Sequence, residues 1–314
     1  IYLVKLLYGN SESQVTKDGK RNEVINGVPD WVYEEEFGFN SALTFNADGS
    51  MLCWIRFDEK DVPTYSLQMF KGLEPEMTEY PGLYSYKYPK AGQKNSTVSV
   101  LSYDIQSRQT RTMQLQMDKD GYIPRIKATS DPQKIIVYTM NRHQDQLCLY
   151  GANPRSTVCK LLIKESVPKY VKEEAMANIL ISSNHILMPS DRNGYMQLYL
   201  YNMNGQLLRK VTDGQYDVTD VYGYDEQTGA TYYQAAGKNP MNREVYVTYK
   251  NGKTECLTSR DGWNIAVFSA DYKYFVNQWS DRNTPYEYGI FNNSGKETVS
   301  LITNSELKLS LIHI

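Results

Sequence analysis

The sequence predicts an all-β fold, a β-propeller built of four-stranded blades. Length, tyrosine content and an internal repeat support this prediction. The chain has 314 residues, a length that one all-β domain can accommodate. Tyrosine supplies 27 of these residues, and its apolar ring with a polar hydroxyl suits half-buried strands better than helix interiors. The composition therefore favours strands over helices.

The charge balance excludes several classes of function. There are 34 basic and 36 acidic residues, which gives a formal net charge of −2. Because the charges nearly cancel, no broad electrostatic attraction to nucleic acid is expected. No stretch approaches the roughly 18 consecutive apolar residues of a membrane-spanning helix, so no membrane span is expected. No cysteine–histidine spacing matches a zinc site, and we expect neither a metal nor another cofactor.

A repeat indicates the blade architecture. Ser190–Asn193 reads SDRN, and the same four residues recur at Ser280–Asn283, 90 positions later. The polar turn at 236–239 occupies the intermediate place, so the unit is about 45 residues, the length of a four-stranded propeller blade. Within one unit, 198–201 and 206–211 read as two strands joined by a tight turn. A β-sandwich would also give short strands but not this repeat length.

The repeat divides the chain into about five and a half blades. We expect a partial propeller over 1–308: the end of a blade at 1–28, a blade with a projecting insertion (59–92) at 29–118, and further blades at 119–166, 167–212, 213–258 and 259–308. The last six residues, 309–314, read LSLIHI after a polar segment. We interpret them as a non-native tail, with a short final strand as the alternative.

Two of the four cysteines are candidates for a disulfide. Cys148 and Cys159 flank a turn at 151–155. A hairpin centred between Asn153 and Pro154 would place them opposite each other, within reach of a bridge in a twisted strand pair. The alternative is two buried free thiols. A disulfide would indicate an oxidising compartment.

The remaining nucleophiles and bases form no recognisable catalytic set. His143 lies in a polar turn and His185 in an apolar strand, and we interpret both as structural residues. Cys53 and Cys256 lie in apolar strands and are predicted core residues. The turn at 118–121 lacks the third acidic position and the distal glutamate of a calcium loop, and no G-x-S-x-G turn is present. The chain therefore contains no predicted catalytic residue.

The most distinctive local feature is the run Asp30–Glu36, DWVYEEE. Three successive glutamates are most often a solvated face, but here they follow the apolar residues Trp-Val-Tyr, which can pin the run against the core. Neighbouring side chains on an extended strand point to opposite faces, so two carboxylates converge only on a helical turn or a kink. Such a pair in a partly dry cavity would bind an ammonium group.

The motif DWVYEEE closely resembles the glutamate motif of the dipeptidyl peptidase IV family, in the prolyl oligopeptidase group of serine peptidases. The resemblance covers residues 1–308, and Cys148 with Cys159 matches a disulfide hairpin of that family. Other similar segments are 59–63, 88–95, 194–201 and 304–305. In that family an eight-bladed propeller caps an α/β-hydrolase domain.

The resemblance implies a specific function. Glu35 and Glu36 would bind the free α-amine of peptide substrates, so that the enzyme releases X-Pro or X-Ala dipeptides, whereas Glu34 has no such role. The implied partners are peptides with a free N-terminus, the protein's own C-terminal hydrolase domain and, through the insertion at 59–92, a second copy in a homodimer. The implied location is periplasmic, cell-surface or secreted.

Two departures from the family limit what this chain does alone. The serine, aspartate and histidine of the hydrolase domain would lie beyond residue 308, so the chain by itself is expected to be inactive. The early blade that supplies a substrate-contacting arginine is expected to be absent, and 170–174 gives no match to a Phe–Arg contact of the family. The alternative function is a non-catalytic propeller scaffold, an inactive relative. A propeller glycosidase is disfavoured because no acid–base pair is recognisable on separate blades.

Overall fold

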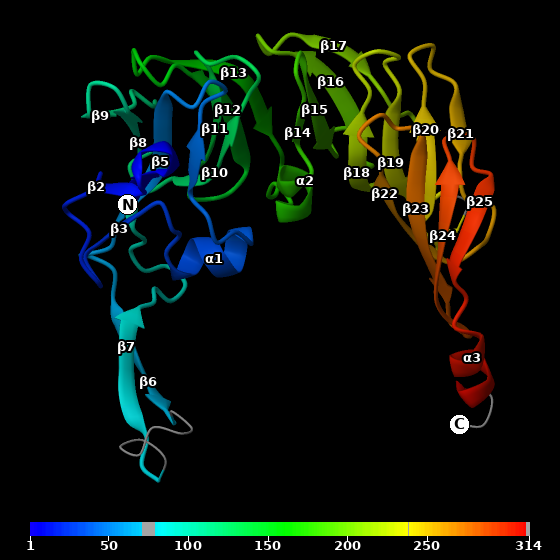
Figure 1. The fold of residues 1–314 in the computed structure, drawn as a ribbon, viewed down its shortest axis with the longest axis horizontal. Helices are drawn as coiled ribbons and strands as arrows, with labels where there is room; N and C mark the ends of the chain where they lie inside the picture. The colour runs from blue at the N-terminus through cyan, green and yellow to red at the C-terminus, as the bar shows by residue number, and fades with distance from the viewer. Residues whose placement is uncertain (71–78, 238, 312–314) are drawn as a thin grey trace. The chain divides into compact units, whose positions relative to one another are not determined.

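The computed structural model describes residues 1–70, 79–237 and 239–311. It divides into two compact units, Ile1–Val171 and Lys172–Ile314. Both consist mainly of antiparallel sheets (Figure 1), and five of these sheets contain a path of four strands. The predicted all-β fold of four-stranded blades is confirmed. In the described part of the chain, every helix is too short or too polar to cross a membrane.

Unit one contains two of the large sheets. The first comprises β3 (Val24–Asn26), β5 (Met51–Asp58), β8 (Thr97–Asp104) and β9 (Gln109–Thr112), with β4 (Leu43–Phe45) also paired to β5. The second comprises β10 (Tyr122–Ala128), β11 (Ile135–Met140), β12 (Gln146–Ala152) and β13 (Cys159–Ser166). The chain begins with β1 (Tyr2–Lys5), the 3₁₀ turn η1 (Leu6–Tyr8) and β2 (Ser11–Gln14), and α1 (Trp31–Phe37) lies between β3 and β4.

The segment predicted as an insertion contains a separate hairpin. β6 (Thr64–Met69) and β7 (Gly82–Lys87) pair only with each other as a two-stranded sheet. The hairpin extends away from the four-stranded sheets of its unit (Figure 1). Residues 71–78 of the predicted insertion lie outside the described residues.

Unit two contains three consecutive four-stranded sheets. They comprise β14 (Leu180–Ile181), β15 (His185–Ser190), β16 (Gln197–Asn202) and β17 (Leu207–Lys210); β18 (Val218–Tyr224), β19 (Thr231–Ala235), β20 (Glu244–Thr248) and β21 (Thr254–Cys256); and β22 (Trp263–Phe268), β23 (Tyr274–Asp281), β24 (Thr284–Asn292) and β25 (Glu297–Ile302). Helix α2 (Glu173–Ala177) precedes them and α3 (Ser305–Leu311) follows them. Of the predicted non-native tail, residues 312–314 lie outside the described residues.

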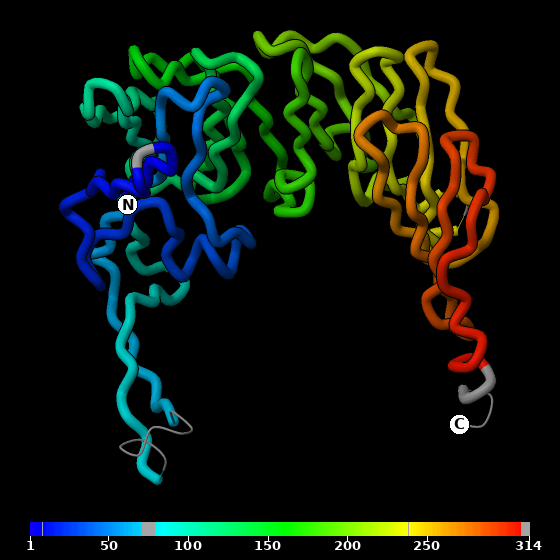
Figure 2. Tube along the Cα trace, in the orientation of Figure 1, coloured from blue at the N-terminus to red at the C-terminus, as the bar shows by residue number. Residues whose placement is uncertain are grey.

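The sequence repeat corresponds to the repeat of sheets. Ser190–Asn193 begins the turn from β15 to β16, and Ser280–Asn283 spans the turn from β23 to β24. Both turns join the second and third strands of their sheets, and the sheet of β18 to β21 separates them along the chain. Figure 2 traces this part of the chain from green through yellow to orange. The predicted hairpin at 198–211 is also confirmed, because β16 pairs antiparallel with β17.

The core of unit two lies between neighbouring sheets. Leu187 and Leu198 of the first sheet cluster with Tyr233 of the second, and Val245 of the second clusters with Phe275 of the third. Alternating apolar side chains are buried in this way, which is the main source of stability in such folds. Tyr233 is fully buried, and its hydroxyl lies 3.0 Å from the hydroxyl of Thr248. At this core position the tyrosine hydroxyl therefore has a polar partner.

Candidate functional site

The acidic run forms a short helix with a defined start and end. Asp30 is the N-cap of α1, and its side chain accepts a hydrogen bond of 3.0 Å from the backbone N–H of Tyr33. Asp is a preferred N-cap because its carboxylate satisfies an otherwise free amide. The helix ends at Gly38, whose φ of 63° is left-handed and therefore favours glycine. The glutamates therefore lie on a helical turn and not on an extended strand.

Two aromatic side chains fix α1 to the core of unit one. Tyr33 and Phe37 are one turn apart on the buried face of the helix. The Tyr33 hydroxyl accepts a hydrogen bond of 3.1 Å from the backbone N–H of Ile123 in β10. The ring of Phe37 lies 5.5 Å from that of Tyr122. These contacts set both the position and the rotation of the helix.

A buried carboxylate reinforces the start of α1. Asp30 is 7% exposed, and the Ser96 hydroxyl donates a hydrogen bond of 2.5 Å to its second carboxylate oxygen. Burial raises the pKa of Asp30, although the hydrogen bonds from Ser96 and the Tyr33 amide oppose the rise. Burial, and next the nearby charge of Asp30, also raise the pKa of Glu59. Asp30 and Glu59 are therefore two buried acids close to each other near the start of α1.

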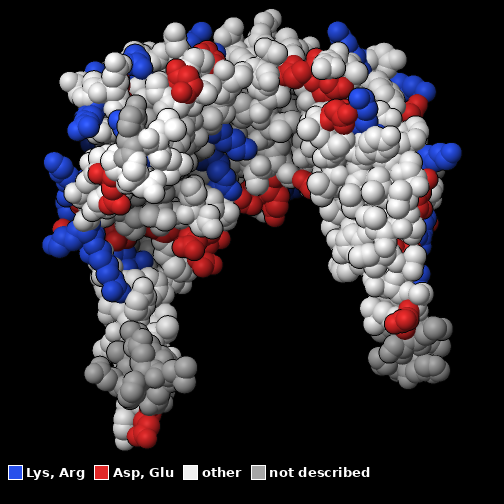
Figure 3. Space-filling model, in the orientation of Figure 1, with Lys and Arg blue, Asp and Glu red and all other residues white. Residues whose placement is uncertain are grey.

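The glutamates Glu34, Glu35 and Glu36 are all exposed. Successive residues on a helix are roughly 100° apart, so the three point in different directions around the face opposite Tyr33 and Phe37. No ion pair or hydrogen bond involves their side chains within the described ranges. Figure 3 shows acidic side chains gathered over α1.

One of the two predicted site residues, Glu36, borders a cavity. Glu36 borders a cavity of about 550 Å³, together with Trp31, Tyr88, Tyr122 and Arg142. The centres of the Trp31 and Tyr88 rings lie 4.0 Å apart. Glu35 is next to Glu36 on the same helix but is not part of the lining. A carboxylate beside aromatic rings can hold an ammonium group through a charge-assisted hydrogen bond and cation–π attraction.

Sequence reasoning missed the residues that support this helix. Asp30 and Gly38 are capping signals in the sequence, and Tyr33 and Phe37 have helical spacing. The hydrogen bond from Ser96 to Asp30 joins residues 66 positions apart in the sequence. The bond from Ile123 to Tyr33 joins residues 90 positions apart. Such contacts have no local sequence signal.

The predicted pairing of Cys148 with Cys159 is wrong. In the β12–β13 hairpin, Cys148 lies opposite Lys164 and Cys159 lies opposite Ala152. The turn spans 153–158, closed by the Asn153 amide bonding to the Val158 carbonyl, so the hairpin centre lies further along the chain than expected. Cys148 is thus four residues, or roughly 13 Å of strand, from the position opposite Cys159, which is too far for a disulfide. All four cysteines are free thiols.

The remaining predicted residues have mixed outcomes. Cys53 is fully buried, as predicted. Cys256 is exposed because β21 is a three-residue outer strand, so its assignment to the core is wrong. His185 Nδ1 lies 2.8 Å from Glu226, which also accepts a 2.6 Å bond from the Ser182 hydroxyl. This contact joins two neighbouring sheets. The described residues contain no group of three or more histidine, cysteine or acidic side chains suited to a metal ion.

Comparisons with known proteins identify similar chains. The sequence model of the "Dipeptidyl peptidase IV (DPP IV) N-terminal region" matches residues 1–286. Dipeptidyl peptidase 4 of Trichophyton equinum is 27% identical over 323 residues, covering 96% of this chain, and that of Arthroderma otae is 28% identical over 309 residues, covering 93%. The chain spans about 40% of the length of these relatives.

A solved structure is also similar. The crystal structure of Porphyromonas gingivalis dipeptidyl peptidase 4 matches with a TM-score of 0.92 and 38% sequence identity. The match covers 96% of this chain and 42% of that one. The likeness therefore extends over both units but over less than half of the bacterial enzyme.

Proposed function

Because the chain belongs to the family of the dipeptidyl peptidase IV N-terminal region, we propose that it is the propeller region that binds the N-terminus of peptide substrates in a serine exopeptidase. The complete enzyme would release X-Pro and X-Ala dipeptides from peptides with a free α-amine. The nucleophile and its base belong to a hydrolase domain outside this chain. We expect the chain alone to have no peptidase activity.

The observation that supports this proposal most strongly is the placement of Glu35 and Glu36. Both carboxylates are exposed on a helix that Asp30 caps and Tyr33 anchors. Within the described ranges neither makes an ion pair, so both are available to a ligand. Glu36 also borders a cavity with aromatic walls.

The physical role of such a pair is to measure distance along the substrate. An α-amine has a pKa of about 8, so it is largely protonated at neutral pH and is attracted to carboxylates. An amine held at a fixed point places the second peptide bond, rather than the first or third, at the nucleophile. Positioning of this kind converts binding energy into rate and selectivity.

Steady-state kinetics of the full-length protein that contains this chain test the proposal. Glu35→Gln and Glu36→Gln keep the side-chain shape and remove the charge, and Glu34→Gln is the matched control on the same helix. For an Ala-Pro substrate with a chromogenic leaving group, we expect kcat/KM to fall by about tenfold or more in each variant, the value of a charged hydrogen bond. The control should retain wild-type kcat/KM.

Unchanged kcat/KM in both variants would remove the glutamates from the mechanism. Absence of dipeptide release by the full-length wild type would favour the scaffold function instead. These two outcomes are distinguishable because the first requires an active enzyme and the second an inactive one.

The partner and location remain predictions. The β6–β7 hairpin exposes apolar side chains, including Leu67 and Leu83 at 38% and 74%, which supports its use in a homodimer. A periplasmic, cell-surface or secreted location follows from the family resemblance alone, since Cys148 and Cys159 form no disulfide.

A further inference from the structure

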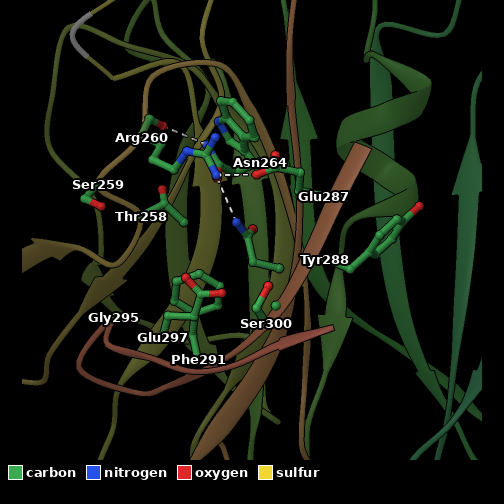
Figure 4. A pocket seen from close by; sticks show the side chains of 13 residues that line it. Thr258, Ser259, Arg260, Asn264, Glu287, Tyr288, Phe291, Gly295, Glu297 and Ser300 are labelled. Atoms are coloured by element: carbon green, nitrogen blue, oxygen red, sulfur yellow. Dashed lines mark hydrogen bonds and ion pairs between the residues drawn. The ribbon is translucent and has the colours of Figure 1, made fainter. Parts of the chain in front are cut away.

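A small polar cavity lies within the last sheet of unit two and shares no residue with the site on α1. Its volume is about 150 Å³. It lies between the β21–β22 loop and the strands β23, β24 and β25 (Figure 4). Its charged lining residues are Arg260, Glu287 and Glu297.

The strand register explains why there is space at this point. Asn277 of β23 lies opposite Gly289 of β24, which in turn lies opposite Ser300 of β25. Gly289 has no side chain, so the middle of this row is open. A Cβ added at Gly289 would lie 2.8 Å from Oε1 of Glu297. The Glu297 carboxylate therefore lies over the glycine, next to the row that contains Asn277.

The hydrogen bonds of the neighbouring strand fix the orientation of the Asn277 amide. Asn264 Nδ2 donates to the backbone carbonyls of Arg243 at 2.9 Å and Arg260 at 3.3 Å. Since only a nitrogen can donate to carbonyls, Asn264 Oδ1 must be the atom that accepts the 2.9 Å bond from Asn277 Nδ2. Oδ1 of Asn277 therefore points away from Asn264, and it accepts no hydrogen bond in the described part of the chain although the residue is 4% exposed.

The charged lining residues differ in the ion pairs and hydrogen bonds that they make. Glu287 accepts a bond of 2.5 Å from Arg260 and is also paired with Lys308. The Arg260 guanidinium is stacked 3.3 Å from the centre of the Trp279 ring. The Glu297 carboxylate has no ion pair or hydrogen bond to any described residue. Glu287 thus has two cationic partners, Arg260 and Lys308, whereas Glu297 pairs with neither of them.

We propose that this cavity binds a small organic cation that carries N–H donors, an alkylammonium or guanidinium group. The cation pairs with Glu297 and donates to Oδ1 of Asn277. An unsatisfied buried acceptor is costly, and a ligand that supplies a donor recovers that cost. The aromatic walls, Trp279 and Phe291, suit a small alkyl group.

The probes are butylammonium and methylguanidinium, followed by nuclear magnetic resonance of the isotope-labelled chain. We expect saturable shifts of the Gly289 backbone amide and of the Asn277 side-chain amide. Tetramethylammonium is also a cation but has no N–H donor, and sodium and calcium ions offer no donor either. None of the three should cause saturable shifts of these signals. Equal, saturable shifts with tetramethylammonium or a metal ion would overturn the proposal, because charge alone would then explain binding.

Two variants test the residues. Glu297→Gln should weaken binding of both probes by about tenfold, because it removes the charge from one hydrogen bond, whereas Glu12→Gln, at an exposed position in unit one, should not. Gly289→Ala fills the open position and should abolish the shifts, with Gly19→Ala as the control because nothing lies within 4 Å of that site. Unchanged affinity in Glu297→Gln, or in a Gly289→Ala variant with a native spectrum, would refute the site.

Discussion

The hydroxyl of Tyr33 accepts a hydrogen bond of 3.1 Å from the backbone N–H of Ile123, 90 residues further along the chain. This bond ties the helix of the glutamate motif to β10 of the next sheet in the same unit. Tyr33 is fully buried, and its ring also lies 4.8 Å from that of Phe57. The Tyr33 side chain therefore contacts two sheets and holds in place the helix that carries Glu35 and Glu36.

Removal of the Tyr33 hydroxyl should destabilise the chain. Tyr33→Phe keeps the ring but leaves the amide of Ile123 buried without an acceptor, which costs about 1–3 kcal/mol. Urea denaturation should show this loss in the free energy of unfolding. Tyr274→Phe is the control, since Tyr274 is 51% exposed. Equal stability of both variants would mean that the bond contributes nothing.

Asp30, the N-cap of α1, should stabilise the chain more through its hydrogen-bond acceptors than through its negative charge. Asp30→Ala removes the partner of both the Tyr33 amide and Ser96, and loss of an N-cap costs about 1 kcal/mol. Asp30→Asn keeps an acceptor and removes a buried charge, so we expect a smaller loss in the same unfolding experiment. Equal losses would show that the carboxylate charge is required.

The bond between His185 and Glu226 should make stability depend on pH. Burial alone would raise the pKa of Glu226, but the Ser182, Asn184 and His185 bonds outweigh it and hold this pKa below its ordinary value of 4.5. A depressed pKa in the folded state gives stability that is present above pH 4.5 and is lost as the pH falls through the folded pKa. The loss of stability that Glu226→Gln causes relative to wild type should therefore be largest at neutral pH and should shrink below pH 4.5. Thermal unfolding experiments at several pH values would measure it. A stability difference between variant and wild type that stays constant from pH 7 to well below pH 4.5 would contradict this mechanism.

The four thiols should react in a defined order. Cys256 is exposed and should be alkylated first by iodoacetamide in the native chain. Burial raises the pKa of Cys159 to about 11 and that of Cys53 to about 12, and Cys53 is fully buried, so it should react last. Mass spectrometry after denaturation without reductant should find four alkylated cysteines. Two unmodified cysteines would indicate a disulfide between Cys148 and Cys159.

The fold could be predicted because its signals are local. The repeat from Ser190 to Ser280 marks equivalent turns, and alternating residues such as those at 198–201 mark strands. The register around Cys148 and Cys159 could not be predicted, because turn length and a shift between Leu149 and Tyr150 determine it. Neither has a clear signal in the residues of the turn.

The site could be predicted only in part. The requirement for a helical turn at Glu35 and Glu36 follows from side-chain geometry, and α1 meets it. The contacts that hold the helix, from Ser96 and Ile123, depend on tertiary packing between distant segments. The cavity beside Glu36 likewise includes Tyr88, which follows β7, and Arg142, which lies in the turn between β11 and β12.

The most direct test of the central proposal compares two substrates of the full-length protein that differ only at the amine. We predict that wild type cleaves an Ala-Pro substrate with a free α-amine far faster than its N-acetylated form. In Glu35→Gln/Glu36→Gln, kcat/KM for the free amine should fall by about 100-fold, toward that of the acetylated form, because two charged bonds to the amine are lost. A double variant that retains the wild-type preference for the free amine would contradict the proposal.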